Sequence, residues 1–154
     1  MTKPFRYYLR VRYQECDPQH VVFNARYADY ADLASFEFMR AALPRPRDAF
    51  DGTFEIKTVR QVVQWKASAR FDDVIEIGIW ASRLGTTSVT LSCELRRAGE
   101  AQVLAAIETV YVHVDVETWK KRQIAPQMRA ALEAGAPGKM ADHAGYLRSG
   151  GHEG

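Results

Sequence analysis

Two hydrophobic periods divide this chain, one helical and one typical of strands, and the change falls near residue 54. Residues 25–42 contain neither Gly nor Pro and predict a helix. Tyr27 and Phe38 lie on one apolar face of this predicted helix. Leu33 and Phe36 lie off that face, so the apolar surface is wider than one seam. We therefore expect a long helix that other elements wrap.

Beyond residue 54, apolar residues alternate with polar ones at every second position, which is the period of a strand. Such runs cover residues 59–65, 75–79 and 89–95, and a less regular run covers about 101–116. Residues 5–14 predict one more strand before the helix. This order of elements predicts an α+β fold, in which a curved antiparallel sheet of about five strands wraps a long central helix.

The connections and the end of the chain differ in composition from these elements. Pro44 ends the long helix and opens a loop that runs to Gly52, and residues 127–133 predict a short helix. Six of the ten glycines lie in the last twenty residues, which contain few apolar side chains. We therefore expect a single domain over residues 1–134 and a flexible C-terminal tail over residues 135–154.

Composition limits the classes of function. With 154 residues, 47% of them hydrophobic, the chain has the length of one domain with a substantial core. A net charge of +2, from 21 basic and 19 acidic residues, requires no cationic face for nucleic acid or a membrane. No apolar run is long enough to span a bilayer, and the N-terminal residues lack the apolar core of a signal peptide.

The cysteines and the missing motifs narrow the function further. Two cysteines without CxxC or Cys/His spacing predict no metal site and a reducing, cytoplasmic location. The chain has no P-loop, no GxGxxG and no GxSxG motif. These absences argue against nucleotide hydrolysis, redox chemistry and serine hydrolysis, and we expect no cofactor.

Residues 12–30 carry the strongest indication of chemistry. Asp17 follows the first predicted strand, and a short turn separates it from the start of the long helix. A helix start leaves backbone N–H groups without intrahelical partners and carries partial positive charge, so it polarises a carbonyl oxygen. A carboxylate beside it attacks that carbonyl or activates water, which indicates acyl transfer or ester-type hydrolysis. Taken alone, Asp17 before Pro18 also fits an ordinary turn aspartate.

The same motif resembles the signature of the hot-dog-fold acyl-CoA thioesterases, in the branch that contains 4-hydroxybenzoyl-CoA thioesterase and the Tol-Pal-associated thioesterases. The places of that signature are filled here by Asp17, Val21, Val22, Phe23, Asn24 and Tyr27. The order of elements and the Phe71-Asp72-Asp73 turn before a strand also resemble this family, over roughly residues 5–133. Family members often carry Gly where this chain has His20, which leaves the substrate class open.

The resemblance implies an enzyme that hydrolyses an acyl- or aryl-CoA thioester to the free acid and CoA. Asp17 is expected to act as the nucleophile or as the general base, and both routes stay open. The backbone amide of Asn24, or of an immediate neighbour, is expected to donate to the oxyanion. The Asn24 side chain has an ordinary alternative role as a helix cap.

Further residues are expected to contact the substrate. The candidates for the acyl pocket are His20, Val22, Phe23, Tyr27, Val59 and Gln61, and the candidates for the CoA phosphates are Arg60, Arg96 and Arg97. Each has an ordinary alternative as a surface-turn histidine, a core or interface side chain, or a solvated arginine.

Two other functions stay open. A hot-dog hydratase or dehydratase pairs a His with an acid, and residues 25–42 contain no His, so that only His20 lies nearby. A non-catalytic acyl-CoA-binding module is the second alternative. In each case the partner is a small acyl-CoA, and the resemblance implies homodimers or homotetramers that join their sheets edge to edge.

Overall fold

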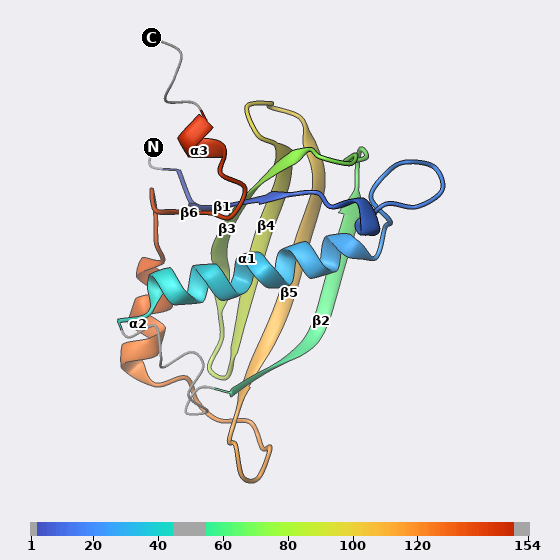
Figure 1. Ribbon diagram of the computed structural model, residues 1–154. Coiled ribbons are helices and arrows are strands. Elements are labelled where there is room, and N and C mark those ends of the chain that lie inside the picture. The colour runs from blue at the N-terminus through green and yellow to red at the C-terminus, as the bar shows by residue number, and fades with distance from the viewer. Residues whose placement is uncertain (1–2, 45–54, 150–154) are drawn as a thin grey trace.

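A computed structural model describes residues 3–44 and 55–149 of the chain (Figure 1). In chain order the elements are β1 (Phe5–Arg10), the 3-10 turn η1 (Tyr13–Glu15), α1 (Arg26–Ala42), β2 (Glu55–Trp65), β3 (Val74–Leu84), β4 (Ser88–Arg97), β5 (Val103–Val114), α2 (Pro126–Ala134), β6 (Met140–Asp142) and α3 (Tyr146–Ser149). The predicted long helix and the strands that follow it are confirmed. The predicted loop from Pro44 to Gly52 lies almost entirely outside the described residues.

One sheet contains all six strands, in the order β2-β5-β4-β3-β1-β6. The first five strands in this order pair antiparallel, and the short β6 pairs with β1 in parallel. Figure 1 shows α1 lying across one face of the curved sheet. The predicted α+β arrangement of a central helix and about five antiparallel strands is therefore confirmed, with β6 as an addition.

The core lies between α1 and the sheet. The apolar side chains that alternate along the strands face the helix. On β3, Ile75, Ile77 and Ile79 are at most 1% exposed. On α1, Tyr30 and Phe38 are 1% exposed. Full burial of an apolar side chain of this size contributes about 1.5–3 kcal/mol. This layer therefore holds the helix against the sheet and fixes where the helix begins.

The apolar surface of α1 extends beyond the face that the sheet covers, as the sequence predicted. Leu33 and Phe36 are 44% and 48% exposed, because the sheet covers one side of α1 and these residues lie off that side. The part of the apolar helix surface that the sheet does not cover is therefore exposed in a single chain.

The first strand is shorter than predicted. It ends at Arg10 instead of continuing to Gln14, and Tyr13, expected on its apolar face, is 80% exposed. The reason is local: the Arg12 N–H donates to the Glu15 carboxylate (2.7 Å), and this bond closes η1 before the strand can continue. The chain therefore turns earlier, directly before Asp17.

Part of the predicted C-terminal tail carries secondary structure. β6 pairs with β1, and the Tyr146 ring of α3 stacks on Tyr8 with ring centroids 5.4 Å apart. The Asp142 carboxylate accepts the N–H groups of Ala144 and Leu147 at 3.0 and 2.9 Å, which fixes the start of α3. Residues 150–154 lie outside the described residues, and the predicted domain boundary at residue 134 stays a prediction.

β2 is an edge strand of the sheet. It pairs with β5 on one side and with no other strand among the described residues. Val59, Val62 and Trp65 on this strand are 59%, 36% and 54% exposed. An edge strand with exposed apolar side chains is a template for pairing with another strand. The opposite edge differs, because β6 covers β1.

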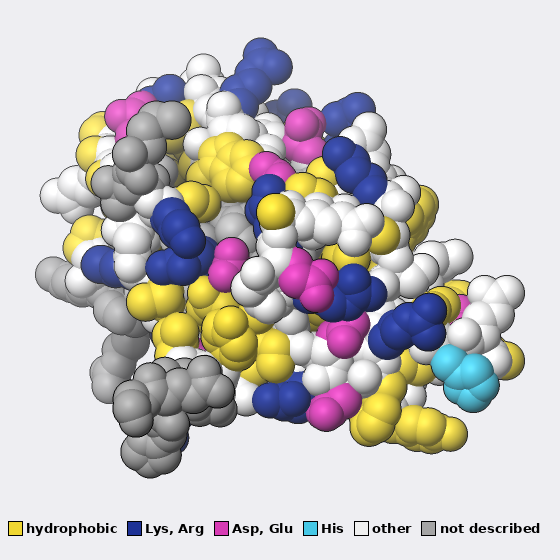
Figure 2. All heavy atoms as spheres, turned by 90° about the horizontal axis from the view of Figure 1, so that it is seen from above, with side chains coloured by type: hydrophobic (Ala, Val, Ile, Leu, Met, Phe, Trp, Pro, Cys, Tyr) yellow, Lys and Arg dark blue, Asp and Glu magenta, His cyan; other side chains and the backbone are white. Residues whose placement is uncertain are grey.

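The surface carries charges of both signs. Figure 2 shows Lys and Arg side chains next to Asp and Glu side chains across the upper face, without a continuous field of one sign. Among residues 3–44 and 55–149, no helix is long and apolar enough to cross a membrane. No group of three or more His, Cys, Asp or Glu side chains in the same residues is arranged to hold a metal ion.

Candidate active site

A tight hairpin between η1 and α1 carries Asp17. The Asp17 N–H donates to the Val21 carbonyl, and the His20 N–H donates to the Asp17 carbonyl, both at 2.9 Å. At the base of the hairpin, the Phe23 N–H donates to the Glu15 carbonyl at 2.9 Å. Such closely spaced bonds fix the two arms relative to each other. Asp17 on the first arm therefore stays beside the end of the second arm, where α1 begins.

The Asp17 carboxylate is half-buried and oriented by its own turn. Its Oδ1 accepts the Gln19 N–H at 2.8 Å, a bond that aspartates commonly form in turns. No hydrogen bond among the described residues uses Oδ2. One carboxylate oxygen is thus held in place, and the other is available to a substrate or to water.

The start of α1 offers backbone donors. The Arg26 N–H donates to the Phe23 carbonyl at 2.9 Å, whereas no hydrogen bond among the described residues uses the N–H of Asn24 or Ala25. The helix is capped at Ala25 without a side-chain bond, so the alternative role of Asn24 as a side-chain cap is wrong. Unused N–H groups at the positive end of a helix stabilise an oxygen that gains negative charge.

A hollow of about 400 Å³ separates the hairpin and the start of α1 from the connection between β2 and β3. Asp17, Asn24 and Tyr27 line it on one side, and Trp65 and Lys66 line it on the other. The rest of its wall consists of Gln19, Val21, Val22, Phe23, Ala67 and Ser68. Asp17 and Asn24, whose backbone N–H is unused, therefore line the same hollow.

Three hydrogen bonds join the two sides of this hollow. The Val22 N–H donates to the Ala69 carbonyl at 2.9 Å, and the Ala69 N–H donates to the Tyr27 hydroxyl at 3.0 Å. The Trp65 indole N–H donates to the Asn24 carbonyl at 3.1 Å. A carboxylate, unused amide donors and aromatic walls in one hollow are suited to acyl transfer at a bound carbonyl group.

Comparison with known proteins assigns the family. The model of the Thioesterase-like superfamily matches residues 11–132. The chain belongs to this superfamily. Over 130 residues it is 31% identical to the acyl-CoA thioester hydrolase YbgC of Escherichia coli O6:H1, and the match covers 80% of this chain and 91% of that protein. The protein is a thioester hydrolase, as the sequence predicted.

Solved structures agree on the fold of this thioesterase. A hypothetical protein from Aquifex aeolicus superposes with a TM-score of 0.76 at 25% identity, over 84% of this chain and 99% of that chain. A 1,4-dihydroxy-2-naphthoyl-CoA thioesterase from Synechocystis superposes with a TM-score of 0.74 at 19% identity, over 83% and 94% of the two chains. The predicted hot-dog fold is confirmed.

A second nucleophilic side chain of the thioesterase, Cys16, lies next to Asp17. Burial, followed by the charges of Glu15, Asp17 and Asp73, raises the pKa of the Cys16 thiol. The thiolate is the nucleophilic form of cysteine, and these surroundings disfavour it. The thiol lies 3.9 Å from the Arg12 carbonyl, to which it donates. The environment therefore argues against a cysteine mechanism.

The structure brings five of the predicted site residues together. Asp17, Val22, Phe23, Asn24 and Tyr27 all line the hollow. His20 lies on the same hairpin but is not part of the wall. Trp65 and Lys66 complete the wall from β2 and the residue after it; the sequence offered Trp65 only as one of several aromatic residues and Lys66 only as one of several basic residues. The sequence signal for these two wall residues was an aromatic residue followed by a basic one at the end of a predicted strand.

Three other predicted residues lie along β2, away from the hollow of the same chain. Val59 and Gln61 occupy the middle of the strand, and the Gln61 side-chain amide donates to the Thr109 hydroxyl at 3.0 Å. Because side chains alternate along a strand, Arg60 points to the other face of the sheet. There it pairs with Glu108 at 3.4 Å and lines a separate hollow of about 420 Å³.

The two arginines at the end of β4 are paired with carboxylates. Arg96 contacts Glu94 at 2.7 Å, and Arg97 contacts Asp73 at 2.8 Å. The hydrogen bond to Asp73 raises the pKa of Arg97. Arg97 also donates to the carbonyl of Ser68, a residue of the hollow's wall. Arg97 therefore supports the wall, and contact of either arginine with CoA stays a prediction.

Replacing Trp65 by Phe is expected to lower kcat/KM about fivefold, since a neutral hydrogen bond contributes about 1 kcal/mol. Phe keeps an aromatic ring but loses the N–H that donates to the Asn24 carbonyl. The measurement is thiol release at several substrate concentrations. Trp119, which is also 54% exposed, provides the control, and Trp119→Phe should leave kcat/KM unchanged. Equal effects of the two substitutions would contradict a role for the Trp65 bond.

Replacing His20 by Gly is expected to raise the thermal midpoint by about 2–4 °C, equivalent to about 1 kcal/mol. His20 has a φ of 64°, in the left-handed region that glycine adopts without a clash. This backbone therefore favours Gly at this position. Activity should be unchanged, because His20 does not line the hollow. Gln19→Gly, at a neighbour outside that region, should instead lower the midpoint, as measured by calorimetry.

Proposed function

We propose that this thioesterase hydrolyses an acyl-CoA or aryl-CoA thioester to the free acid and CoA. The observation that carries the proposal is the hollow that Asp17 lines together with Asn24, a residue at the start of α1 whose N–H is unused. A thioester bound there meets a donor for its carbonyl oxygen and a carboxylate for its carbonyl carbon. The relationship to YbgC, an acyl-CoA thioester hydrolase, supports CoA as the thiol.

In this mechanism the carbonyl oxygen accepts a hydrogen bond from the N–H of Asn24, or of Ala25. The positive end of α1 stabilises the negative charge that develops on that oxygen. The Trp65 bond to the Asn24 carbonyl polarises the peptide group that carries the Ala25 N–H, which strengthens that donor. Both donors belong to the backbone, so they need no reorganisation during the reaction.

Asp17 acts by one of two routes. As a nucleophile, its carboxylate oxygen bonds to the carbonyl carbon, the C–S bond breaks, and CoA leaves as a thiolate; water then cleaves the mixed anhydride. As a general base, the carboxylate takes a proton from a water molecule whose oxygen attacks the carbonyl carbon, and the same C–S bond breaks. A thiolate is a good leaving group, so neither route needs an acid beside the sulfur atom.

A second copy of the chain is expected to complete the site through the β2 edge. Val59 is about 20 Å from Trp65 along the strand, too far to reach the hollow of its own chain. Two β2 strands paired antiparallel about a two-fold axis at Val62 bring the middle of the partner subunit's β2 toward Trp65. The predicted contacts of Val59 and Gln61 with substrate are then made across the dimer. Pairing of two such dimers into a tetramer stays a prediction.

The walls of the hollow favour a compact acyl or aryl group. Val22, Phe23, Tyr27 and Trp65 supply apolar and aromatic surface, which aromatic rings and short chains fill. Lys66 adds a cation to the wall and is exposed, so it suits a phosphate of CoA. A cytoplasmic location stays a prediction.

The other candidate functions have less support. A hydratase of this fold requires a His paired with an acid, and no His lines the hollow. A non-catalytic acyl-CoA-binding module would not need a carboxylate with an uncommitted oxygen beside unused amide donors. Both alternatives predict that CoA esters bind without release of thiol.

The test is a thiol-release assay across CoA esters that differ in chain length and aromaticity. We expect free CoA from at least one aryl or short acyl ester, together with the free acid. A change in enoyl absorbance without thiol would establish hydration instead. Binding of the esters with no release of thiol across the panel would establish the non-catalytic alternative.

A further inference from the structure

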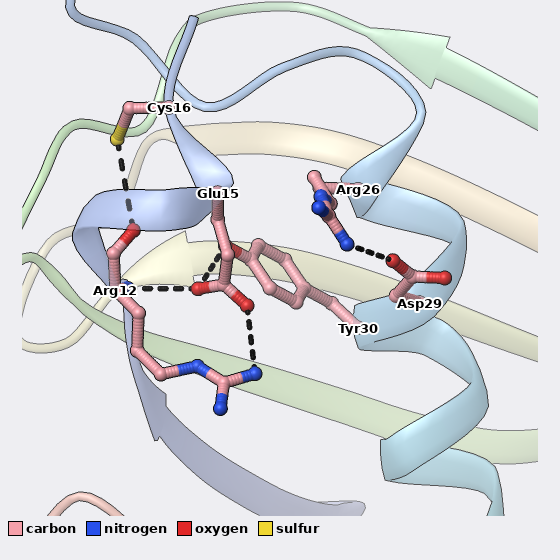
Figure 3. A network of polar contacts seen from close by, with 6 residues as sticks. All are labelled: Arg12, Glu15, Cys16, Arg26, Asp29 and Tyr30. Carbon is pink, nitrogen blue, oxygen red and sulfur yellow. Dashed lines mark hydrogen bonds and ion pairs between the residues drawn. The ribbon is translucent and has the colours of Figure 1, made fainter.

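A buried carboxylate lies two residues before Asp17. Glu15 is 5% exposed, and its Oε1 accepts the Arg12 N–H at 2.7 Å and the Tyr30 hydroxyl at 3.0 Å. Its Oε2 accepts the Arg12 guanidinium at 3.2 Å. Figure 3 shows the Glu15 and Tyr30 side chains pointing toward each other from η1 and α1. Burying a carboxylate lowers the stability of the fold unless the charge is paired and hydrogen-bonded in this way. Its position beside the hairpin suggests that it holds the hairpin in place.

The main chain of the same residue holds the hairpin. The Glu15 carbonyl accepts the Phe23 N–H at 2.9 Å, and Cys16 and Val22 form the next bridge between the two arms. Phe23 directly precedes Asn24 at the start of α1. Glu15 therefore contacts both arms of the hairpin through its backbone, and the interior side of α1 through its carboxylate.

This arrangement couples the two groups that the proposed mechanism needs. Asp17 belongs to the hairpin, whereas the backbone donors belong to the start of α1. The bond between Glu15 and Tyr30 prevents the hairpin from shifting along the helix. A misplacement of about 1 Å between reacting groups can lower a rate about a hundredfold. The hydrogen bond between Glu15 and Tyr30 can therefore affect the rate although neither residue contacts the substrate.

We propose that Glu15 is a positioning residue of the thioesterase, which sets the place of the Asp17 carboxylate relative to the start of α1 through the hydroxyl of Tyr30. This inference rests on the proposed function of Asp17. Burial, together with the charge of Glu15, raises the pKa of Tyr30, so its hydroxyl keeps its proton and remains a donor. Arg12 balances the charge of the carboxylate from the solvent side, where its side chain is 67% exposed.

The test uses Tyr30→Phe and Glu15→Gln. Tyr30→Phe removes one hydroxyl and leaves both contacts of Arg12 with Glu15 intact. We expect kcat to fall about tenfold in each variant, with KM changed by less than about twofold, because the substrate contacts remain. The double variant should lose no more than the larger single effect, because both changes break the same bond. Asp29→Asn, which breaks the exposed pair of Arg26 and Asp29 (3.2 Å) on the same helix, should leave kcat unchanged.

A second comparison separates positioning from a merely structural role. In an Asp17→Asn background, Tyr30→Phe should leave the residual rate unchanged, because the hydroxyl acts through the missing carboxylate. A further fall in that residual rate would overturn the proposal, as would an unchanged kcat in a folded Tyr30→Phe protein. All assays are run at one temperature, about 20 °C below the lowest thermal midpoint among the variants, so that unfolded protein does not contribute. If Glu15→Gln fails to fold, Tyr30→Phe decides.

The outcome for Asp17→Asn alone distinguishes the two proposals. Full activity in that variant would refute the proposed function, whatever Tyr30→Phe does. Loss of activity in Asp17→Asn, combined with normal kcat in the folded Tyr30→Phe protein, would refute only the positioning role.

Discussion

Replacing Asp17 by Asn is expected to lower kcat for thioester hydrolysis by at least about a thousandfold, within the range seen for loss of a general base or nucleophile. Asn cannot form the anhydride, and its amide is too weak a base to activate water. The amide donors at the start of α1 remain, so a small residual rate should persist. The measurement is steady-state release of CoA from the best ester of the panel.

The fold should tolerate this change. The side-chain oxygen of Asn accepts the Gln19 N–H as Oδ1 of Asp17 does, so the turn is kept. The thermal midpoint should therefore stay within about 2 °C of the unsubstituted protein, well below the shift that a core substitution causes. Asp29→Asn makes the same chemical change on the exposed surface of α1 and should have no effect on kcat. Retention of most activity by Asp17→Asn would remove the carboxylate from the mechanism.

Replacing Val62 by Glu on the edge of β2 is expected to separate the proposed dimer and to remove most of the activity. A two-fold axis repeats every side chain, so one substitution places two like charges near each other in the interface. Like charges directly opposite each other on paired strands repel, and pairing removes part of their solvent, so we expect the dimer to weaken at least about tenfold. Light scattering should report the 17.4 kDa mass of one chain instead of twice that mass. Activity should fall with the fraction of dimer, because each hollow loses Val59 of the partner subunit.

The control places the same charge at the other edge of the sheet. Leu147 in α3 is 44% exposed and its N–H donates to the Asp142 carboxylate of β6, so Leu147→Glu should change neither mass nor activity. The single chain should remain folded in both variants, because both side chains are on the surface. A fully active monomer, with or without the substitution, would show that one chain contains the complete site.

Much of the site could be predicted from residues that are close together in the sequence. Asp17 and Asn24 are separated by a turn, and a turn followed by a helix start brings a carboxylate and backbone donors together wherever it occurs. The alternation on β3, with Ile75, Ile77 and Ile79 buried, followed equally from the period of two. These features depend on local geometry, which the order of side chains specifies.

Other features escaped the sequence because they depend on a distant partner. Glu15 resembles any charged residue before a turn, and its role appears only when Tyr30 from α1 donates to it. Trp65 reads as a half-buried strand residue until the sheet brings its indole to the Asn24 carbonyl. The glycine-rich composition of the last residues masked β6, which is ordered by pairing with β1 and not by its own propensity.

The alternating periods, the α+β class and the motif that places a carboxylate before a helix start follow from the order of side chains alone, because each is set by neighbours along the chain. The walls of the hollow at Asp17 depend on the packing of distant elements, since the sheet brings Trp65 and Lys66 into the same hollow as Asn24. The same packing leaves the β2 edge exposed, away from the buried layer that holds α1. Contacts between distant segments depend on how whole elements pack, and the residues of one element do not contain that information.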